Sequence, residues 1–199
     1  MIEIKNIKNQ TSRIHNLLSN LRLDAKQLRA SKPRQSDIKK IKRQPIYIVC
    51  DNVLDTYNIG SIFRLADAVA ASGVYLCGGS ETPPNSRIAK ASVGCDKWVP
   101  WQYFATAAEA ISKLKTQNSK LKVIAIEQHS KAVDYRSLNY EQLTMNHKRP
   151  VVFVVGHETD GVSKEVLKMA DKIVEIPMFG VNISLNVMVS LAIVLFRAI

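Results

Sequence analysis

Three separated clusters of polar residues stand beside apolar runs in this 199-residue sequence, and their residue types suit ligand binding. The last cluster lies in Pro177–Ile199 and carries Ser184 and Asn186 just before a long apolar helical stretch. Free backbone N–H groups at the start of such a helix, with hydroxyl and amide side chains beside them, can hold an anionic or polar ligand. For this segment alone, a simple helix cap at Ser184 is the more common explanation.

The other two clusters add a cation and a carboxylate. Asn58 and Arg64 are six residues apart at the predicted start of a helix, while Gly156 and Glu158 directly follow an apolar run. The planar fork of Arg64 suits phosphate. Asn58 could orient it or cap the helix, and Glu158 could fix Arg64 or the last cluster. Ser184 suits positioning more than nucleophilic attack, because no His–acid pair is apparent to activate it.

Common cofactor fingerprints are absent. The first apolar run is followed by DNVLDTYNIGS, which lacks the glycine-rich turn of dinucleotide-binding units, and no GxxxxGK[ST] pattern occurs. The cysteines at positions 50, 77 and 95 are odd in number and widely spaced. They predict neither a disulfide framework nor a zinc site, and we expect no metal. Cys50 and Cys77 are predicted core residues.

The elements that must position these clusters alternate between strand and helix from Pro45 onward. Short apolar, largely β-branched runs predict buried parallel strands at Ile46–Cys50, Val74–Cys77, Val123–Ile126, Val151–Val155 and Ile173–Ile176. Helical periodicity marks Ile59–Ala71, Ala105–Lys115, Ser163–Met169 and Leu185–Ala198. This alternation predicts an α/β domain with a parallel sheet of five or six strands and flanking helices. Gly78–Ser86 and residues 128–149 are predicted loops.

The positive charge is concentrated at the N-terminus. Residues 1–43 hold twelve Lys or Arg against three acids, so they carry +9 of the total net charge of +11. Apolar residues recur at helical spacing within this block, at Ile14, Leu17, Leu18, Leu21, Ala25 and Leu28, and KKIKR follows as a loose tether. A basic amphipathic helix fits a nucleic-acid contact better than a membrane surface, and a solvated arm is the simplest alternative. No signal peptide or membrane span is predicted, which indicates a soluble, cytoplasmic protein.

The three clusters in their order resemble the three motifs of the SpoU family of RNA ribose 2′-O-methyltransferases, members of the SPOUT superfamily. The segments are Asn58–Arg64, Val155–Ser163, and Ile176–Met178 followed by Ser184–Asn186. The resemblance covers about residues 45–199, with residues 1–44 as a basic, RNA-contacting helical extension. It implies a C-terminal trefoil knot, which general rules of chain threading would not predict. It also implies S-adenosylmethionine as cofactor and a homodimer.

The resemblance assigns roles to individual residues. The catalytic set is Asn58, Arg64, Glu158, Ser184 and Asn186, and the cofactor-binding set is Ile126, Gly156, Ile176 and Leu185. An arginine is a poor proton acceptor, so we expect Arg64 to clamp a phosphate and to stabilise negative charge on the 2′-oxygen. His157 departs from the family pattern, so local hydrogen bonding there could differ.

The substrate remains open between transfer RNA and ribosomal RNA. The segment Ile124–Gln128 is similar to transfer-RNA guanosine-18 2′-O-methyltransferases, and the short basic extension favours the same substrate. Two alternatives are a noncatalytic RNA-binding module that retains the fold and a basic DNA-binding protein, although no recognition-helix motif supports the latter.

Overall fold

The computed structural model describes residues 22–138 and 150–198, which fall into two compact units divided between Ser31 and Lys32. The described part of the first unit carries α2 (Ala25–Ala30), which buries none of its residues. The Asp24 carboxylate caps this helix by accepting hydrogen bonds from the backbone N–H groups of Lys26 and Gln27. Most of the predicted amphipathic stripe, from Ile14 to Leu21, lies outside the described residues.

The second unit contains a seven-stranded sheet in the order β3-β2-β1-β6-β4-β7-β5, and every neighbouring pair is parallel. The strands are β1 (Gln44–Asp51), β2 (Ala71–Cys77), β3 (Trp101–Phe104), β4 (Lys122–Ile126), β5 (Val133–Asp134), β6 (Val151–Gly156) and β7 (Lys172–Glu175). The predicted parallel α/β architecture is therefore confirmed.

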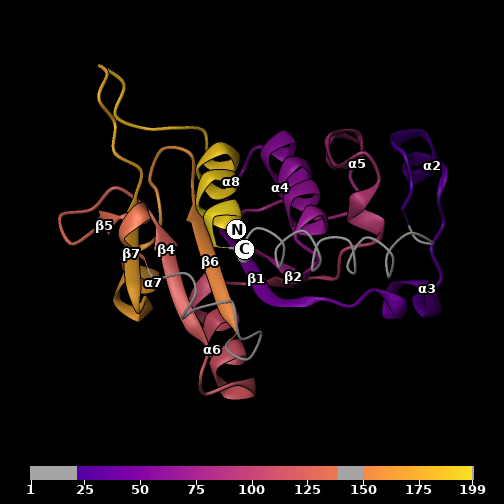
Figure 1. Ribbon diagram of the computed structural model, residues 1–199, viewed down its shortest axis with the longest axis horizontal. Helices are drawn as coiled ribbons and strands as arrows, with labels where there is room; N and C mark the ends of the chain where they lie inside the picture. The colour runs from indigo at the N-terminus through magenta and orange to yellow at the C-terminus, as the bar shows by residue number, and fades with distance from the viewer. Residues whose placement is uncertain (1–21, 139–149, 199) are drawn as a thin grey trace, which may run out of the picture. The chain divides into compact units, whose positions relative to one another are not determined.

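Helices cover both faces of this sheet, as Figure 1 shows. The second unit contains the helices α3 (Gln35–Lys40), α4 (Thr56–Ala68), α5 (Ser86–Ser92), α6 (Ala107–Gln117), α7 (Lys164–Met169) and α8 (Val187–Arg197), with 3₁₀ turns η1 (Cys95–Lys97) and η2 (Tyr135–Ser137). Helix α4 packs against α5 and α8 on one face, and α6 packs with α7 on the other. Strand β6 is buried at every residue because both of its faces are covered, which explains its unbroken apolar sequence.

All five predicted strands are present, but two short ones were missed. In β3 only Phe104 is buried, so Trp101–Phe104 lacks the apolar run that marks a central strand. Strand β5 has two residues and lies inside a predicted loop. Both are edge strands with only one neighbouring strand, so fewer of their side chains need to be apolar. Cys50 and Cys77 are buried core residues, as predicted.

The predicted loose tether is wrong at Arg43. Its guanidinium donates hydrogen bonds to the carbonyl oxygens of Ala71, at 2.9 Å, and Trp98, at 2.6 Å. Burial lowers the pKa of Arg43, an effect that nearby Asp67 opposes. Carbonyl groups can hold a basic residue against the core, so a run of basic residues need not be solvated.

The chain between β7 and α8 extends away from the sheet before it returns (Figure 1). Three apolar side chains of this loop are strongly exposed, namely Phe179 at 92%, Val181 at 102% and Ile183 at 73%. The trefoil knot stays a prediction. No helix within residues 22–138 and 150–198 is long and apolar enough to cross a membrane.

Candidate functional site

The first two polar clusters meet at the carboxyl edge of the sheet. Strand β1 ends at Asp51 and pairs there with Gly156, the last residue of β6. On the other side of β6, strand β4 ends at Ile126, which pairs with Val174 of β7. Parallel strands all end at one edge, and a crevice outside this edge is where open α/β sheets bind ligands.

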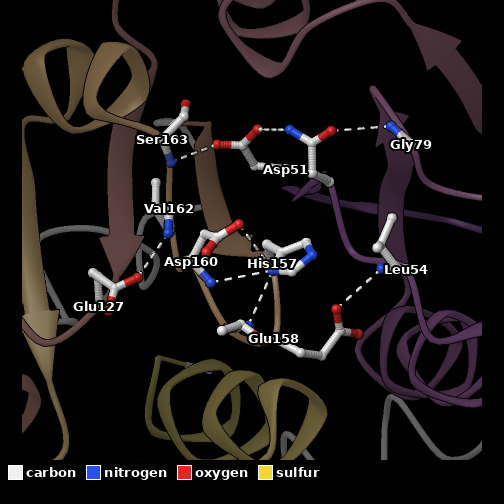
Figure 2. A network of polar contacts seen from close by, with 11 residues as sticks. Asp51, Leu54, Gly79, Glu127, His157, Glu158, Asp160, Val162 and Ser163 are labelled. Atoms are coloured by element: carbon white, nitrogen blue, oxygen red, sulfur yellow. Dashed lines mark hydrogen bonds and ion pairs between the residues drawn. The ribbon is translucent and has the colours of Figure 1, made fainter.

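Glu158 is the centre of a hydrogen-bonded relay at this edge. Its Oε1 accepts from the Asp55 backbone N–H and from Asn58 Nδ2, both at 3.0 Å. Its Oε2 accepts from the Leu54 backbone N–H at 3.1 Å, a contact drawn in Figure 2. The loop after β6 is therefore tied to the start of α4.

Asn58 carries the relay on to the third cluster. Its side chain is buried, and its Oδ1 accepts from Asn186 Nδ2 at 2.9 Å. A carboxylate is only an acceptor, so Glu158 must face the NH₂ group of Asn58 and thereby fixes which way this amide points. Asn186 then turns its own oxygen to the backbone N–H groups of Met188, at 3.0 Å, and Val189, at 3.4 Å. The relay ends as the N-cap of α8.

The pKa of Glu158 lies below its ordinary value of 4.5. Partial burial by itself raises this pKa, but the hydrogen bonds from Asn58 and from the backbone of Leu54 and Asp55 outweigh burial. Glu158 is therefore held as the carboxylate that the relay requires.

Arg64 lies apart from this relay. The helix begins at Thr56, capped by Asp55, so Arg64 stands in its third turn, where sequence analysis placed it at the start. Six residues along a helix correspond to about 9 Å of rise and roughly 120° of rotation, so Arg64 and Asn58 face different directions. Among the described residues Arg64 forms no salt bridge with an acid. The Glu158 carboxylate, which was expected to fix Arg64 or the last cluster, accepts a hydrogen bond from Asn58 instead. Its exposed guanidinium remains available to a ligand.

The expectation that Ser184 caps the last helix is wrong. Helix α8 starts at Val187, and the side chain that accepts its first N–H groups belongs to Asn186. Ser184 is exposed, and its backbone N–H donates to Asn182 Oδ1 at 3.2 Å. Leu185 lies between them with 38% of its surface exposed. Asn186 holds the cap position because its amide oxygen accepts from both N–H groups of α8 while its NH₂ group donates to Asn58.

Two glycines and a carboxylate fix the loop after β6. A Cβ on Gly156 would overlap the backbone of Gly161, which folds back against the end of the strand. Gly161 has φ +70°, and a Cβ there would overlap the carboxylate of Glu127. Glu127 Oε2 accepts from the Val162 backbone N–H at 2.7 Å, as Figure 2 shows. The cofactor role predicted for Gly156 stays a prediction beside this packing role.

Asp51 holds the same loop from the other side. It is buried, and its Oδ2 accepts from the Ser163 backbone N–H at 2.8 Å. Its Oδ1 accepts from Asn52 Nδ2 at 3.2 Å. These roles of Asp51 and Glu127 were not predicted, although Asp51 is the last residue of β1 and Glu127 directly follows β4, and a carboxylate at the end of a buried strand was the available signal.

His157 has a local role in the turn. Its Nδ1 accepts from the backbone N–H groups of Thr159, at 3.0 Å, and Asp160, at 3.1 Å. A nitrogen that accepts these bonds carries no proton, so its 3.6 Å approach to the Asp160 carboxylate is not an ion pair in this state. The imidazole thus holds the turn after β6 through its Nδ1.

Comparison with known proteins decides the family. The model of the SpoU rRNA Methylase family matches residues 45–196, about three quarters of the chain. The chain belongs to the SpoU rRNA Methylase family. Among its relatives, the tRNA (guanosine(18)-2'-O)-methyltransferase of Escherichia coli K12 is 34% identical over 161 residues. That match covers 79% of this chain but only 64% of the relative's length.

Solved structures of SpoU family members share the fold. The A. aeolicus TrmH/SpoU tRNA modifying enzyme is 28% identical with a TM-score of 0.68, over 87% of this chain and 80% of the other. An AdoMet-bound rRNA methyltransferase from Sinorhizobium meliloti is 29% identical with a TM-score of 0.68, over 86% of this chain and 59% of the other. Within the described residues of this SpoU family chain, no group of three or more His, Cys, Asp or Glu side chains is arranged to hold a metal.

Proposed function

We propose that this chain is an S-adenosylmethionine-dependent RNA ribose 2′-O-methyltransferase that acts on transfer RNA. The observation that carries the proposal is the relay from Glu158 through Asn58 to Asn186, which joins the three motif segments at one edge of the sheet. A protein that only bound RNA would not need this chain of oriented amides, which runs from the buried Asn58 to Asn186. The Escherichia coli transfer-RNA methyltransferase and the A. aeolicus tRNA modifying enzyme described above support the substrate.

The residues at this edge fit the cofactor. Ile126 and Gly156 end neighbouring strands, and Ile176 follows the next strand, so backbone groups and apolar side chains lie close together. Leu185 adds exposed apolar surface from the loop before α8. A mostly apolar pocket with few polar groups is usual for such a ligand. When bound, S-adenosylmethionine supplies an electrophilic methyl group for transfer to the ribose oxygen.

The remaining groups suit the handling of the ribose and its phosphate. Arg64 would clamp a phosphate beside the target ribose and stabilise negative charge on the 2′-oxygen while the proton leaves to water. Asn186, held by both Asn58 and α8, would keep the loop that carries Ser184 in place. Positioning of this kind supplies much of the rate of a displacement reaction, which requires the oxygen close to the methyl carbon.

The basic N-terminal residues would bind the RNA backbone. Lys26 and Arg29 lie on α2, and Lys39 and Lys40 lie on α3, all of them exposed. Neutralising phosphates releases counterions, so RNA affinity should fall steeply with salt. Replacing Lys26 and Lys39 by alanine should lower the slope of log affinity against log salt by about 0.7 to 0.9 for each lost contact.

We also infer a homodimer that forms through α8, in the cytoplasm where RNA and cofactor are available. Val189 and Phe196 of this helix are 37% and 48% exposed, although α8 is apolar at every position except Ser190 and Arg197. Sedimentation should show a dimer for the wild type and a monomer for Phe196→Glu. A wild-type monomer would contradict this inference.

The decisive experiment is methylation of total cellular RNA with labelled S-adenosylmethionine, followed by mapping of the modified ribose. Label in transfer RNA supports the proposal, and label confined to ribosomal RNA identifies the alternative substrate. Calorimetric titration with S-adenosylmethionine separates an enzyme from a noncatalytic module, because a folded protein that binds RNA but not the cofactor would be the latter. Competition between transfer RNA and duplex DNA at fixed salt tests the DNA-binding alternative.

A further inference from the structure

The carboxyl edge of the sheet continues past the relay into an exposed apolar surface. We call this surface the edge shelf, and it consists of Leu54, Tyr57, Gly78, Gly79 and Tyr103. Its three large side chains are half exposed, Leu54 at 49%, Tyr57 at 50% and Tyr103 at 52%. The proposed catalytic residues do not explain why aromatic and apolar groups of this size should face water.

The floor of the edge shelf is backbone. A Cβ on Gly79 would lie 2.9 Å from Leu54 Cδ2, so the leucine side chain covers a position that has no side chain of its own. Gly78 has φ +61°, a conformation that favours glycine, and a Cβ there would overlap Asn52. Asn52 Oδ1 accepts from the Gly79 N–H at 3.0 Å and holds the two peptides in place. Figure 2 shows Leu54 and Gly79 at this edge.

The ring of Tyr103 is fixed in place although it is exposed. Its hydroxyl donates to the Gly78 carbonyl oxygen at 2.9 Å, and the Gly78 N–H donates to the Phe104 carbonyl oxygen at 3.1 Å. An exposed ring that is held by its own hydroxyl binds a flat ligand with less loss of freedom than a mobile ring does. Tyr103 therefore has the properties of a preformed stacking surface.

The edge shelf is joined to the relay by one hydrogen bond and by adjacency in the chain. Leu54 donates its backbone N–H to Glu158, and Tyr57 directly precedes Asn58 in the first turn of α4. A ligand whose sugar lies at Asn58 and Asn186 can thus place an attached or adjacent ring over Leu54 and Tyr57. Single-stranded RNA has this form, because its unstacked bases are planar, apolar on both faces and linked to the ribose.

We propose that the edge shelf stacks one or two unpaired nucleobases of the RNA, at or next to the nucleotide whose ribose is methylated. This proposal rests on the proposed function for the position of the ribose. Tyr57 and Leu54, which adjoin the relay, receive the nearer base, and Tyr103 over its glycine floor receives the farther one. Base stacking on aromatic side chains is tolerant of sequence, so the edge shelf selects unpaired RNA and does not by itself select a base.

The first test measures binding of an unmodified transfer-RNA transcript at fixed salt. Removal of a stacking ring typically costs about 1–3 kcal/mol per base, so Tyr57→Ala and Tyr103→Ala should each raise the Kd about 5- to 150-fold. Tyr57→Phe retains the ring and should stay within about twofold of wild type. Val133→Ala is the control and should bind normally. Val133 is 37% exposed and lies in β5, the outer strand at the other end of the strand order from β3. Unchanged Kd values for both alanine variants would overturn the proposal.

The second test locates the RNA directly. Ultraviolet cross-linking of the same transcript to the wild-type protein, followed by mass spectrometry, should identify peptides that contain Tyr57 or Tyr103. Cross-links found only elsewhere would overturn the proposal. So would alanine variants that change the sedimentation of the free protein, because a second copy of the chain would then be what covers the shelf.

Methylation kinetics separate this proposal from the proposed function. If RNA cross-links to the shelf but no methyl group is transferred, the proposed function fails and the stacking surface stands. If methyl transfer occurs and the Tyr57→Ala and Tyr103→Ala variants keep the wild-type KM for RNA, the stacking surface fails and the proposed function stands. The KM for S-adenosylmethionine should be the same in all variants.

Discussion

Replacing Glu158 by glutamine changes the relay by only a few atoms. The carboxylate offers Oε1 to Asp55 and Asn58 and offers Oε2 to Leu54. A glutamine has one oxygen, so if it serves Asp55 and Asn58, its NH₂ group faces the Leu54 N–H. The substitution therefore removes one hydrogen bond and brings two donors together.

The expected loss of stability is about 1–2 kcal/mol. One hydrogen bond contributes about 0.5–1.5 kcal/mol net, and an unsatisfied donor costs about 1–3 kcal/mol when it is fully buried. Leu54 is 49% exposed, so water can reach its N–H group and the lower end of the second range applies. Activity should fall further, by about 10- to 100-fold in kcat, because a loosened Asn58 no longer holds Asn186 at the methyl-transfer site.

The assay is a double-mutant cycle between Glu158→Gln and Asn186→Ala, with urea unfolding and methylation kinetics as readouts. Residues in one network typically show a coupling energy of about 0.5–3 kcal/mol, whereas independent sites add. Glu165→Gln, an exposed acid in the first turn of α7, is the matched control and should change neither readout. Additive effects of the two substitutions would refute the relay, even if each alone reduced activity.

The pH dependence gives a second check with a defined sign. The pKa of Glu158 is lower in the folded protein than its ordinary value of 4.5, so folding favours the ionised form. The carboxylate thus contributes its full stability above about pH 4.5 and loses that contribution as the pH falls through the folded pKa. The stability difference between wild type and Glu158→Gln should therefore shrink as the pH is lowered below 4.5.

Three further substitutions test separate parts of the site. Arg64→Lys should lower kcat/KM for RNA at least about tenfold without changing cofactor binding, because a point charge cannot reproduce a bidentate fork; near-normal turnover would exclude the phosphate clamp. Asn186→Asp keeps the acceptor that caps α8 but loses the donor to Asn58, so activity should fall more than the melting temperature does, and the reverse order would make Asn186 only a cap. Gly161→Ala should destabilise the protein by about 1–3 kcal/mol in urea unfolding, since φ is +70° there and Glu127 fills the space; an unchanged midpoint would contradict this packing.

The sheet could be predicted from sequence where burial on both faces imposes a continuous apolar run. Strand β6 is the clearest case, because each of its residues is buried. Strand β3 escaped prediction since an edge strand needs only one covered face, and Phe104 alone meets that need. The anchoring of Arg43 was not predicted either, because its hydrogen-bond partners are backbone carbonyl groups, which every residue has and which no sequence pattern marks.

The sequence by itself indicated that Asn58, Glu158 and Asn186 belong to one site, since each stands after a predicted strand or near the start of a predicted helix, but it also grouped Arg64 with them, which lies apart from the relay. Only the tertiary structure decided how they pair. Asn58 could have served Arg64, yet its amide lies between Glu158, 100 residues away in the chain, and Asn186, 128 residues away. Hydrogen bonds require donor and acceptor within about 3 Å and nearly in line, and a position this exact depends on how β1, β6 and α8 pack together.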